Sequence, residues 1–311
     1  MSILLSGRWP EAERDQWLAL LGAALPEERF VLAPEPEVEI AVVANPAPGA
    51  LQGLPRLGFI QSLWAGVEKL LADETLPPGI PLARMVDPAM NEAMPQTALW
   101  AVLGLHRGFF QVQAQQRRRE WRQPAQPRAA EWRVLVLGLG ELGGRVAQVL
   151  AAQGYAVSGY SRSPAAHAAL AGVRCLHGGL EVLDAALAEA DTVINLLPLT
   201  AATRGLFDAA RLARFKPGAG LVNLARGAHV QEADLLAALA QGRPGHAVLD
   251  VFQQEPLPPE HAFWGHEQIT VLPHTAAQTD ARSAAALVAA NVRAWRAGSP
   301  PAHGVKRERG Y

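Results

Sequence analysis

The chain has 311 residues, of which 50% are hydrophobic and 18% are charged. This composition provides enough apolar material for about two domains with buried cores, and it excludes an intrinsically disordered protein. The 28 lysine and arginine residues are balanced by 29 aspartate and glutamate residues, which leaves a net charge of -1. Neither nucleic acid nor a membrane surface is therefore an expected partner.

Cysteine content and apolar runs indicate the compartment. The single cysteine, Cys175, cannot form an intramolecular disulfide, which is typical of a reducing compartment. No stretch reaches the roughly 18 to 20 apolar residues that a membrane span needs. Residues 1–15 lack the leading charge and the long apolar core of a signal peptide. The sequence predicts a soluble, cytoplasmic protein.

The first part of the chain is typical of a small α/β domain. A helix is expected over 11–25, between the first two of three strands. These strands are expected at 3–6, 40–44 and 57–62. A proline-rich stretch over 74–91 then separates this series from the rest of the chain.

A helix is predicted over 92–113, with Asn91 as its N-cap and Pro95 tolerated near its first turn. A second irregular stretch follows over 115–133. It contains three consecutive arginines, 117–119, which we interpret as a solvated face because no glycine-rich loop accompanies them.

From residue 132 onward, apolar strands alternate with helix-like segments rich in alanine and leucine. The strands are expected at 132–137, 155–160, 192–196, 220–223, 246–250 and 268–272. This alternation predicts a doubly wound parallel sheet. A last helix over 280–297 follows the final strand and is assigned to the first domain. We therefore expect two Rossmann-like α/β domains, with a nucleotide domain at 96–279 inserted in a smaller substrate domain made of 1–95 plus 280–311.

A glycine motif joins the first strand of the larger domain to the helix that follows it. Gly138 permits a tight turn, Gly140 lets the backbone approach a pyrophosphate, and Gly143 lets the helix pack closely on the strand. At Glu141 and Leu142 the helix N-terminus offers unpaired N–H groups to a phosphate. The motif follows a strand and opens a helix, so it predicts a dinucleotide-binding site.

The end of the second strand of this domain indicates which dinucleotide binds. NAD enzymes place Asp or Glu there to accept a hydrogen bond from the ribose 2′-hydroxyl. Here Ser161-Arg162-Ser163 takes that place, so a guanidinium and two hydroxyls are available for a 2′-phosphate. NADP(H) is predicted in preference to NAD(H), with an ordinary polar turn as the alternative.

Three further motifs each follow a predicted strand, where ligands bind in open parallel sheets. They are residues 223–227, 249–257 and 272–277. Together with the glycine motif and residues 195–198, they resemble the D-isomer-specific 2-hydroxyacid dehydrogenase family, and within it the bacterial glyoxylate/hydroxypyruvate reductase A group. The resemblance covers nearly the whole chain, including the ending at 307–311.

The resemblance implies a catalytic set. Arg226 matches the family's substrate arginine, Glu255 its acid, and His274 its acid/base histidine. A guanidinium can hold the carboxylate of a 2-oxo acid and polarise the neighbouring ketone. An imidazolium next to a carboxylate can donate a proton to the ketone oxygen. The implied reaction is NADPH-dependent reduction of glyoxylate to glycolate and of hydroxypyruvate to D-glycerate, with no metal.

The resemblance also implies further cofactor contacts. They are Leu197, Pro198, Thr203, Ala225 and Asp250. A strand exit is the alternative for Leu197 and Pro198, and a helix cap is the alternative for Asp250. His229 is interpreted as a loop or helix-start residue rather than a catalytic one.

In the small domain the resemblance implies substrate-binding residues Trp64, Ala65 and Gly66, whose backbone N–H groups would meet the substrate carboxylate. Trp64 replaces a residue that is often small in the family. Its ring could narrow the pocket, stack on a substrate side chain or point into the domain interface. A bulkier 2-oxo acid is therefore one alternative, and a dinucleotide-sensing, corepressor-like protein is another. Family members are usually homodimers, so a homodimer is expected, with the helix at 92–113 as a candidate contact.

Overall fold

The computed structural model describes residues 2–162 and 170–310. The chain divides into two compact units, Met1–Met90 with Thr279–Tyr311 and Asn91–Gln278. The larger unit is thus one continuous segment inserted in the smaller. The first boundary lies at residue 90, within helix α3 (Pro88–His106), whereas the sequence predicts it at 95.

The smaller unit is built on a parallel sheet. Among the described residues this sheet has five strands in the order β2-β1-β3-β4-β5. Their bounds are β1 Ser2–Gly7, β2 Arg29–Val31, β3 Val38–Ala44, β4 Phe59–Ser62 and β5 Leu82–Ala83. The sequence predicts β1, β3 and β4. It does not predict β2 and β5, which are edge strands of only three and two residues.

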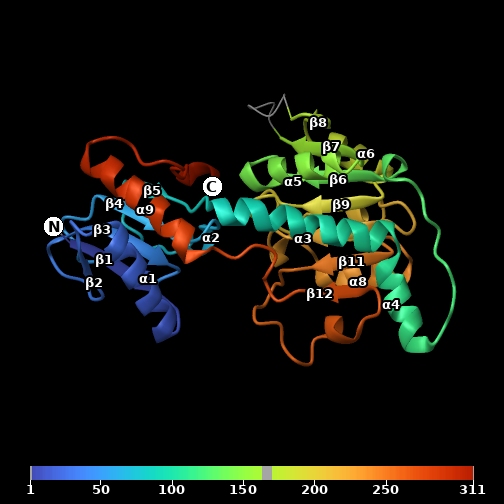
Figure 1. Cartoon of the computed structure of the whole chain (residues 1–311), viewed down its shortest axis with the longest axis horizontal. Coiled ribbons are helices and arrows are strands. Elements are labelled where there is room, and N and C mark those ends of the chain that lie inside the picture. Colours follow the sequence, from blue (N-terminus) through green and yellow to red (C-terminus); the bar gives the residue numbers. More distant parts are fainter. Residues whose placement is uncertain (1, 163–169, 311) are drawn as a thin grey trace. The chain divides into compact units, whose positions relative to one another are not determined.

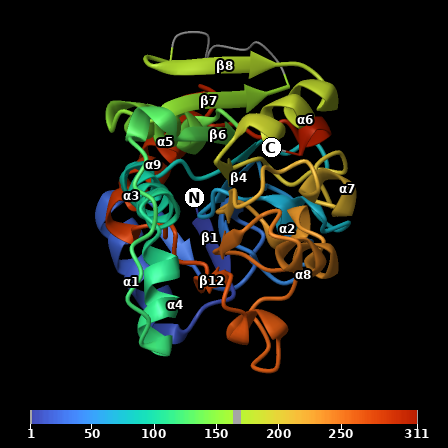
Figure 2. The ribbon, with the colours of Figure 1, turned by 90° about the vertical axis from the view of Figure 1, so that its right-hand side faces the viewer.

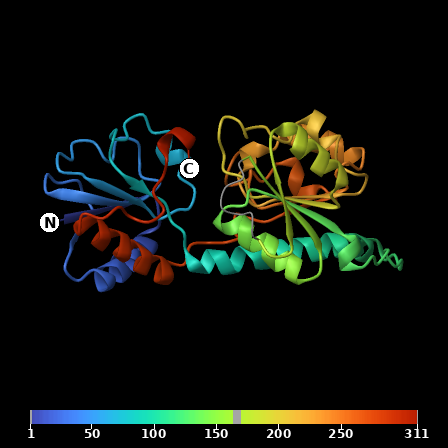
Figure 3. The same cartoon turned by 90° about the horizontal axis from the view of Figure 1, so that it is seen from above.

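Helices cover one face of this sheet. Alternate residues of β3 point to opposite faces, so Ile40 and Val42 pack with α1 (Glu11–Ala24) and α9 (Ala281–Arg296). Figure 3 shows these two helices on the same side of the strands. The intervening residues of β3 pack against loop side chains and the short helix α2 (Glu68–Leu71). Burial on both faces explains why β3 is almost continuously apolar.

The larger unit has a parallel sheet of seven strands within the described residues, in the order β12-β11-β10-β9-β6-β7-β8. Their bounds are β6 Arg133–Leu137, β7 Ala156–Ser161, β8 Val173–His177, β9 Thr192–Asn195, β10 Gly220–Asn223, β11 His246–Leu249 and β12 Ile269–Val271. These two parallel sheets confirm the predicted α/β fold class. The sequence did not predict β8, whose residues are only partly buried at the edge of the sheet.

Helices cover both faces of the seven-stranded sheet, as Figure 2 shows. One face carries α3 and α5, and the other carries α6, α7 and α8. The bounds are α4 Phe109–Arg118, α5 Glu141–Ala152, α6 Leu180–Glu189, α7 Ala209–Leu212 and α8 Glu232–Ala240. Short 3₁₀ turns lie at Ala129–Glu131, Gly227–His229, Ala262–Gly265 and Arg307–Arg309. No helix in the described part of the chain is long and apolar enough to cross a membrane.

The predicted helix over 92–113 is wrong at both ends and in its middle. Helix α3 begins at Pro88, where proline fits the first helical position, and the Asp87 carboxylate accepts the Ala89 N–H at 3.2 Å. Asn91 and Pro95 therefore lie inside α3. The helix ends at His106 because Gly108 is left-handed, with φ of 67°, and α4 begins at the next residue.

The strand order creates a switch point in the larger unit. From β6 the chain proceeds outward through β7 to β8, and it then crosses back to β9 on the other side of β6 (Figure 1). Ligands of open α/β sheets bind at the carboxyl ends of the strands next to such a reversal. The topology therefore indicates a ligand-binding site formed by the loops that follow β6, β7, β9, β10 and β11.

Candidate active site

In the glycine motif after β6, two glycines lie against neighbouring backbone atoms and the third borders open space. Gly138 has φ of +91°, and a Cβ there would lie 2.7 Å from the Leu196 carbonyl oxygen. A Cβ on Gly143 would lie 1.7 Å from the Gly138 carbonyl oxygen. No described protein atom comes within 4 Å of a Cβ placed on Gly140. The fold itself therefore requires glycine at 138 and 143, whereas at 140 glycine leaves surface open for a ligand.

This loop leads directly into α5, with Gly140 as its N-cap in an extended conformation. The N–H groups of Glu141 and Leu142 belong to the first turn and so have no partner within the helix. Unpaired N–H groups and the positive end of the helix dipole favour an anion. The open surface and these donors together fit the pyrophosphate of a dinucleotide.

The second predicted cofactor group lies at the end of β7. Ser161 is the last residue of this strand and Arg162 follows it, at the carboxyl edge that β7 shares with β6. Both residues are described by the structure, whereas Ser163 lies outside the described residues. The end of β7 is the position at which Rossmann enzymes contact the adenosine ribose.

Arg226 follows β10 and is held through its own backbone. Its carbonyl oxygen accepts hydrogen bonds from Asn223 Nδ2 at 2.9 Å and from the His229 N–H at 3.2 Å. Asn223 is fixed in turn, because its Oδ1 accepts a hydrogen bond from Asn195 Nδ2 at 3.0 Å. The buried amides of two neighbouring strands thus set the path of the loop that carries Arg226.

His229 completes this network. Its side chain is fully buried, and Nδ1 lies 3.0 Å from Asn195 Nδ2 while Nε2 lies 3.4 Å from the Pro198 carbonyl oxygen. Nδ1 also lies 3.1 Å from the Arg226 carbonyl oxygen. If Nδ1 accepts the Asn195 hydrogen bond, the ring proton is on Nε2 and points to Pro198; if Nδ1 carries the proton, it donates to Arg226. A side chain so enclosed supports the loop, in line with its interpretation as a structural residue. The sequence motifs contain both asparagines but give no sign that they meet across strands.

Glu255 and His274 form a hydrogen-bonded ion pair. His274 Nδ1 lies 2.7 Å from Glu255 Oε2, and Glu255 Oε1 accepts the Phe252 N–H at 2.9 Å. The hydrogen bond to Glu255 is the main cause that raises the pKa of His274, while partial burial and the charge of Arg226 lower it. The ring is about half exposed, so a ligand can reach it. This arrangement keeps an imidazolium available as a proton donor.

The backbone of His274 is unusual, with φ of +54°. Its N–H donates to the Asp250 carbonyl oxygen at 2.9 Å, and the Asp250 carboxylate accepts the N–H groups of Thr275 at 2.7 Å and Ala276 at 3.1 Å. Burial raises the pKa of Asp250, although these N–H bonds oppose the shift. Asp250 therefore caps a turn rather than a helix, and it holds His274 in a conformation that non-glycine residues rarely adopt.

The loops after β10 and β11 touch at a second glycine. A Cβ on Gly227 would lie 1.9 Å from the carbonyl carbon of Phe252. Only glycine allows this approach, which locks the loop that bears Arg226 against the loop that bears Glu255. The structure thus brings the three predicted catalytic residues to one edge of the sheet, and the charge of Arg226 is close enough to affect the pKa of His274.

The remaining predicted cofactor residues line the loops after β9 and β10. Thr203 is buried, and its hydroxyl donates to the Pro198 carbonyl oxygen at 2.8 Å and accepts the Thr200 N–H at 2.8 Å. It therefore shapes the loop from within. Leu197 is half-buried, and the carbonyl oxygen of the buried Ala225 accepts a hydrogen bond from Arg226 Nη1 at 2.6 Å.

In the smaller unit the predicted substrate residues lie in the turn between β4 and α2. Ser62 Oγ holds this turn, since it donates to the Trp64 carbonyl oxygen at 3.0 Å and accepts the Trp64 N–H at 3.1 Å. Trp64 is half-buried and packs against the hydrophobic core beneath α1 and α9. Within the described residues, no acceptor is recorded for the N–H groups of Ala65 and Gly66.

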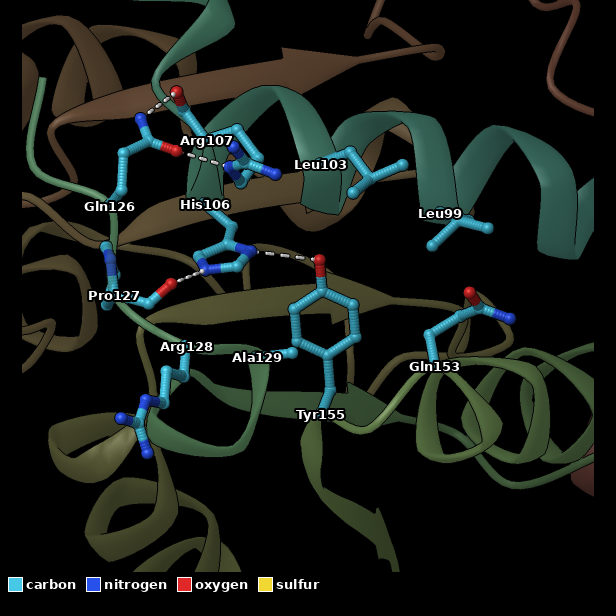
Figure 4. Close-up of a pocket in the computed structure, with 10 residues that line it drawn as sticks. All are labelled: Leu99, Leu103, His106, Arg107, Gln126, Pro127, Arg128, Ala129, Gln153 and Tyr155. Atoms are coloured by element: carbon cyan, nitrogen blue, oxygen red, sulfur yellow. Dashed lines mark hydrogen bonds between the residues drawn. The ribbon is translucent and has the colours of Figure 1, made fainter. Parts of the chain in front are cut away.

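A separate cavity of about 390 Å³ lies at the other edge of the larger sheet. Figure 4 shows His106 between Tyr155 and Pro127 on its wall. His106 Nε2 lies 2.8 Å from the Pro127 carbonyl oxygen and Nδ1 lies 3.1 Å from the Tyr155 hydroxyl, so both ring nitrogens are engaged. Tyr155 directly precedes β7, which places this cavity at the amino ends of the strands, away from the loops described above.

Comparisons with known proteins find relatives in sequence and in structure. Residues 99–276 match the family model of the D-isomer-specific 2-hydroxyacid dehydrogenase, NAD binding domain. A glyoxylate/hydroxypyruvate reductase A from Serratia proteamaculans is 40% identical over 312 aligned positions, covering 97% of this chain and 98% of the relative.

Solved structures similar to this chain include members of the same family. The D-isomer-specific 2-hydroxyacid dehydrogenase from Xanthobacter autotrophicus Py2, in complex with NADPH and MES, has a TM-score of 0.93 and 38% identity, covering 100% of this chain and 99% of that one. The NADPH-dependent glyoxylate/hydroxypyruvate reductase from Sinorhizobium meliloti, in complex with NADP and sulfate, has a TM-score of 0.90 and 32% identity over 100% and 99%.

Proposed function

The chain belongs to the D-isomer-specific 2-hydroxyacid dehydrogenase family, and we propose that it reduces small 2-oxo acids with NADPH, converting glyoxylate to glycolate and hydroxypyruvate to D-glycerate. The observation that carries this proposal is the Glu255–His274 ion pair at 2.7 Å, on the same sheet edge as Arg226. The substrates named for the relatives from Serratia and Sinorhizobium support the choice of 2-oxo acid.

Three side chains divide the work on the substrate. Arg226 binds the substrate carboxylate and polarises the ketone, because a planar guanidinium can donate to both groups. Bound NADPH supplies the hydride that reduces the ketone carbon. His274 donates a proton from Nε2 to the ketone oxygen as negative charge develops there. Glu255 stays ionised, stabilises the charged ring and fixes its orientation through Nδ1.

The cofactor is assigned to the residues at the switch point. The glycine motif, with the first N–H groups of α5, would bind the pyrophosphate, and Ser161 and Arg162 would bind the 2′-phosphate. The residues that would line the nicotinamide half are Leu197, Pro198, Thr203, Ala225 and Asp250. The open surface at Gly140 supports this assignment. The family model's name supports a dinucleotide, and the two neighbouring structures hold its phosphorylated form.

For the smaller unit, the proposal assigns the substrate carboxylate to the N–H groups of Ala65 and Gly66. Trp64 is proposed as a further substrate-binding residue of this unit. Part of its ring packs on the core, so the side chain is held rather than free to move aside. A bulkier 2-oxo acid, phenylpyruvate-like or branched-chain, remains the second candidate substrate, because an aromatic ring at this position offers a stacking surface.

We also propose that the protein is a cytoplasmic homodimer. Large apolar side chains are exposed on α3, on α4 and on the segment after α4. They are Trp100, Phe109, Val112 and Trp121, the last of which is 96% exposed. Apolar surface gathered on neighbouring elements is typical of a protein–protein contact. A molar mass measured by light scattering would test this assignment, since a monomer would contradict it.

The function is tested by initial rates of NADPH oxidation with glyoxylate, hydroxypyruvate, pyruvate and phenylpyruvate side by side, with NADH as the control cofactor. We expect the highest kcat/KM with glyoxylate or hydroxypyruvate and NADPH. Preference for phenylpyruvate would keep the mechanism and favour the bulkier substrate. Tight binding of NADPH without oxidation by any 2-oxo acid would contradict the proposal and favour a dinucleotide sensor.

A further inference from the structure

His177 is the last residue of β8, and the sheet register pairs it with Ser161, the last residue of β7. Parallel strands end at the same edge, so the imidazole lies beside the residues proposed to bind the 2′-phosphate. Figure 2 shows β7 and β8 side by side at the end of the sheet. The sequence analysis did not predict this strand and gave His177 no role.

The ring of His177 is oriented by a hydrogen bond to β7. Its Nδ1 lies 3.1 Å from Ser161 Oγ, and the side chain is half-buried. When the serine hydroxyl donates to Nδ1, the ring proton is on Nε2. Within the described residues, Nε2 has no recorded partner. In this tautomer the ring presents one N–H donor, on Nε2.

The segment after β8 is tied to β7 as well. The Tyr160 hydroxyl lies 2.9 Å from the Gly178 carbonyl oxygen and 3.2 Å from that of Gly179, so it bonds to the residues that follow His177. The Glu181 carboxylate faces the same segment and accepts the Gly179 N–H at 3.2 Å. The backbone around His177 is therefore fixed from two sides, which favours one position of the imidazole.

The hydrogen bonding of His177 differs from that of two other histidines of the larger unit, His106 and His229. His106 and His229 are buried, and each has a partner within hydrogen-bond distance of both ring nitrogens. His177 is half-buried, and within the described residues only its Nδ1 has a recorded hydrogen-bond partner. In such an arrangement one nitrogen fixes the ring, and the second is available to a ligand.

We propose that His177 recognises the 2′-phosphate of NADPH together with Arg162, by donating Nε2–H to a phosphate oxygen. The proposal rests on the proposed use of NADPH. A hydrogen bond to a charged acceptor is about twice as strong as one between neutral groups, so His177 makes a measurable contribution to the choice of NADPH over NADH. With His177, the proposed site has hydrogen-bond donors from the ends of two strands, β7 and β8.

The test is calorimetric binding of four probes to the purified protein: NADPH, NADH, 2′,5′-ADP and 5′-AMP. For His177→Ala we expect the dissociation constants of NADPH and 2′,5′-ADP to rise about tenfold, as for loss of one hydrogen bond to a charged group. The constants of NADH and 5′-AMP, which lack the 2′-phosphate, should change less than about twofold. His177→Gln, which keeps an N–H donor, should lie between the wild type and His177→Ala.

Two results would overturn the proposal. One is an unchanged NADPH constant, and the other is an equal rise for NADPH and NADH, which would indicate general disturbance of the sheet edge. His303→Asn is the matched control, because this histidine is exposed in the other unit and its φ of 59° suits asparagine. If wild-type protein itself binds NADPH no more tightly than NADH, the proposed use of NADPH fails, which is a result distinct from failure at His177.

Discussion

The two halves of the seven-stranded sheet hold their functional residues by different means. In the half formed by β9 to β12, side chains fix one another: Glu255 holds the His274 ring, and buried amides hold the loop of Arg226. In the half formed by β6 to β8, backbone shape dominates, through glycines that no other residue could replace at 138 and 143. The catalytic side chains are therefore held mainly by side-chain bonds in one half, and the loop proposed to bind the pyrophosphate is shaped by close backbone packing in the other.

This difference implies two classes of variant. A substitution of a catalytic side chain in the first half should lower turnover even when cofactor is saturating. A substitution in the glycine motif or at the end of β7 should change cofactor affinity or folding, and should spare turnover once the cofactor is bound. The four predictions below test this division, beginning with the largest expected effect.

The two arginines give the sharpest contrast. Arg226→Ala should lower kcat/KM for glyoxylate by about 10³-fold or more, because the group that polarises the ketone is lost. Arg162→Ala should instead raise the KM for NADPH far more than that for NADH, and should leave kcat at saturating NADPH much closer to that of the wild type. Steady-state kinetics with both cofactors measures both effects. Equal losses of kcat in the two variants would contradict the division.

The glycine motif offers a matched pair. Gly143→Ala should reduce the free energy of unfolding by about 3 kcal/mol, since its Cβ would lie 1.7 Å from the Gly138 carbonyl oxygen. Gly140→Ala should leave stability within about 0.5 kcal/mol, because no described protein atom lies within 4 Å of its Cβ. It should nevertheless weaken NADPH binding. Urea unfolding and calorimetry distinguish the two, and normal cofactor binding by Gly140→Ala would argue against a pyrophosphate at this place.

Glu255→Gln should lower kcat by about 10- to 100-fold and should change the pH profile of reduction. The protonated His274 is the proton donor, so the rate falls as pH rises through the pKa of His274. The bond to Glu255 raises that pKa. Without the carboxylate, the fall should move to lower pH. A variant whose rate falls at the same pH as the wild type would show that Glu255 does not set the protonation of His274.

The smallest expected effect is at His229. His229→Leu leaves one of the two N–H groups of the buried Asn195 amide without an acceptor, while the other still donates to Asn223 Oδ1, and this should cost about 1 to 2 kcal/mol of stability. The loop of Arg226 should become less well fixed, so kcat/KM should fall, though far less than in Arg226→Ala. Urea unfolding beside kinetics tests this prediction. A loss of activity equal to that of Arg226→Ala, with unchanged stability, would give His229 a direct role in the reaction.

Much of the site follows from the sequence because parallel strands share one edge. Once the strands that precede 138, 224, 250 and 272 are recognised, their loops must lie at the same edge of the sheet, whatever the register. The glycine motif is equally local, since strand, turn and helix are adjacent in the chain. The family resemblance, confirmed by the comparisons, added which of the converging side chains to select.

The parts of the fold and the site that the sequence does not predict depend on contacts between residues far apart in the chain. Asn195 contacts Asn223 and His229 because the register of β9 and β10 places the two asparagines opposite each other. In the sequence, each asparagine looks like an ordinary residue at the end of a strand, so these contacts could not be predicted. The left-handed backbone of His274 is followed by two N–H groups, those of Thr275 and Ala276, that donate to the carboxylate of Asp250, a residue 24 positions before His274. Strand β8 escapes prediction because an edge strand buries little and so tolerates polar residues such as Arg174 and His177.

The most direct test of the proposed reaction is the configuration of its product. Hydroxypyruvate should be reduced with NADPH and the glycerate resolved on a chiral column, with Arg226→Ala as the control for background reduction. The proposed D-specific reductase should yield D-glycerate alone, in an amount equal to the NADPH consumed. L-glycerate, a racemic product, or the same yield from Arg226→Ala would contradict it.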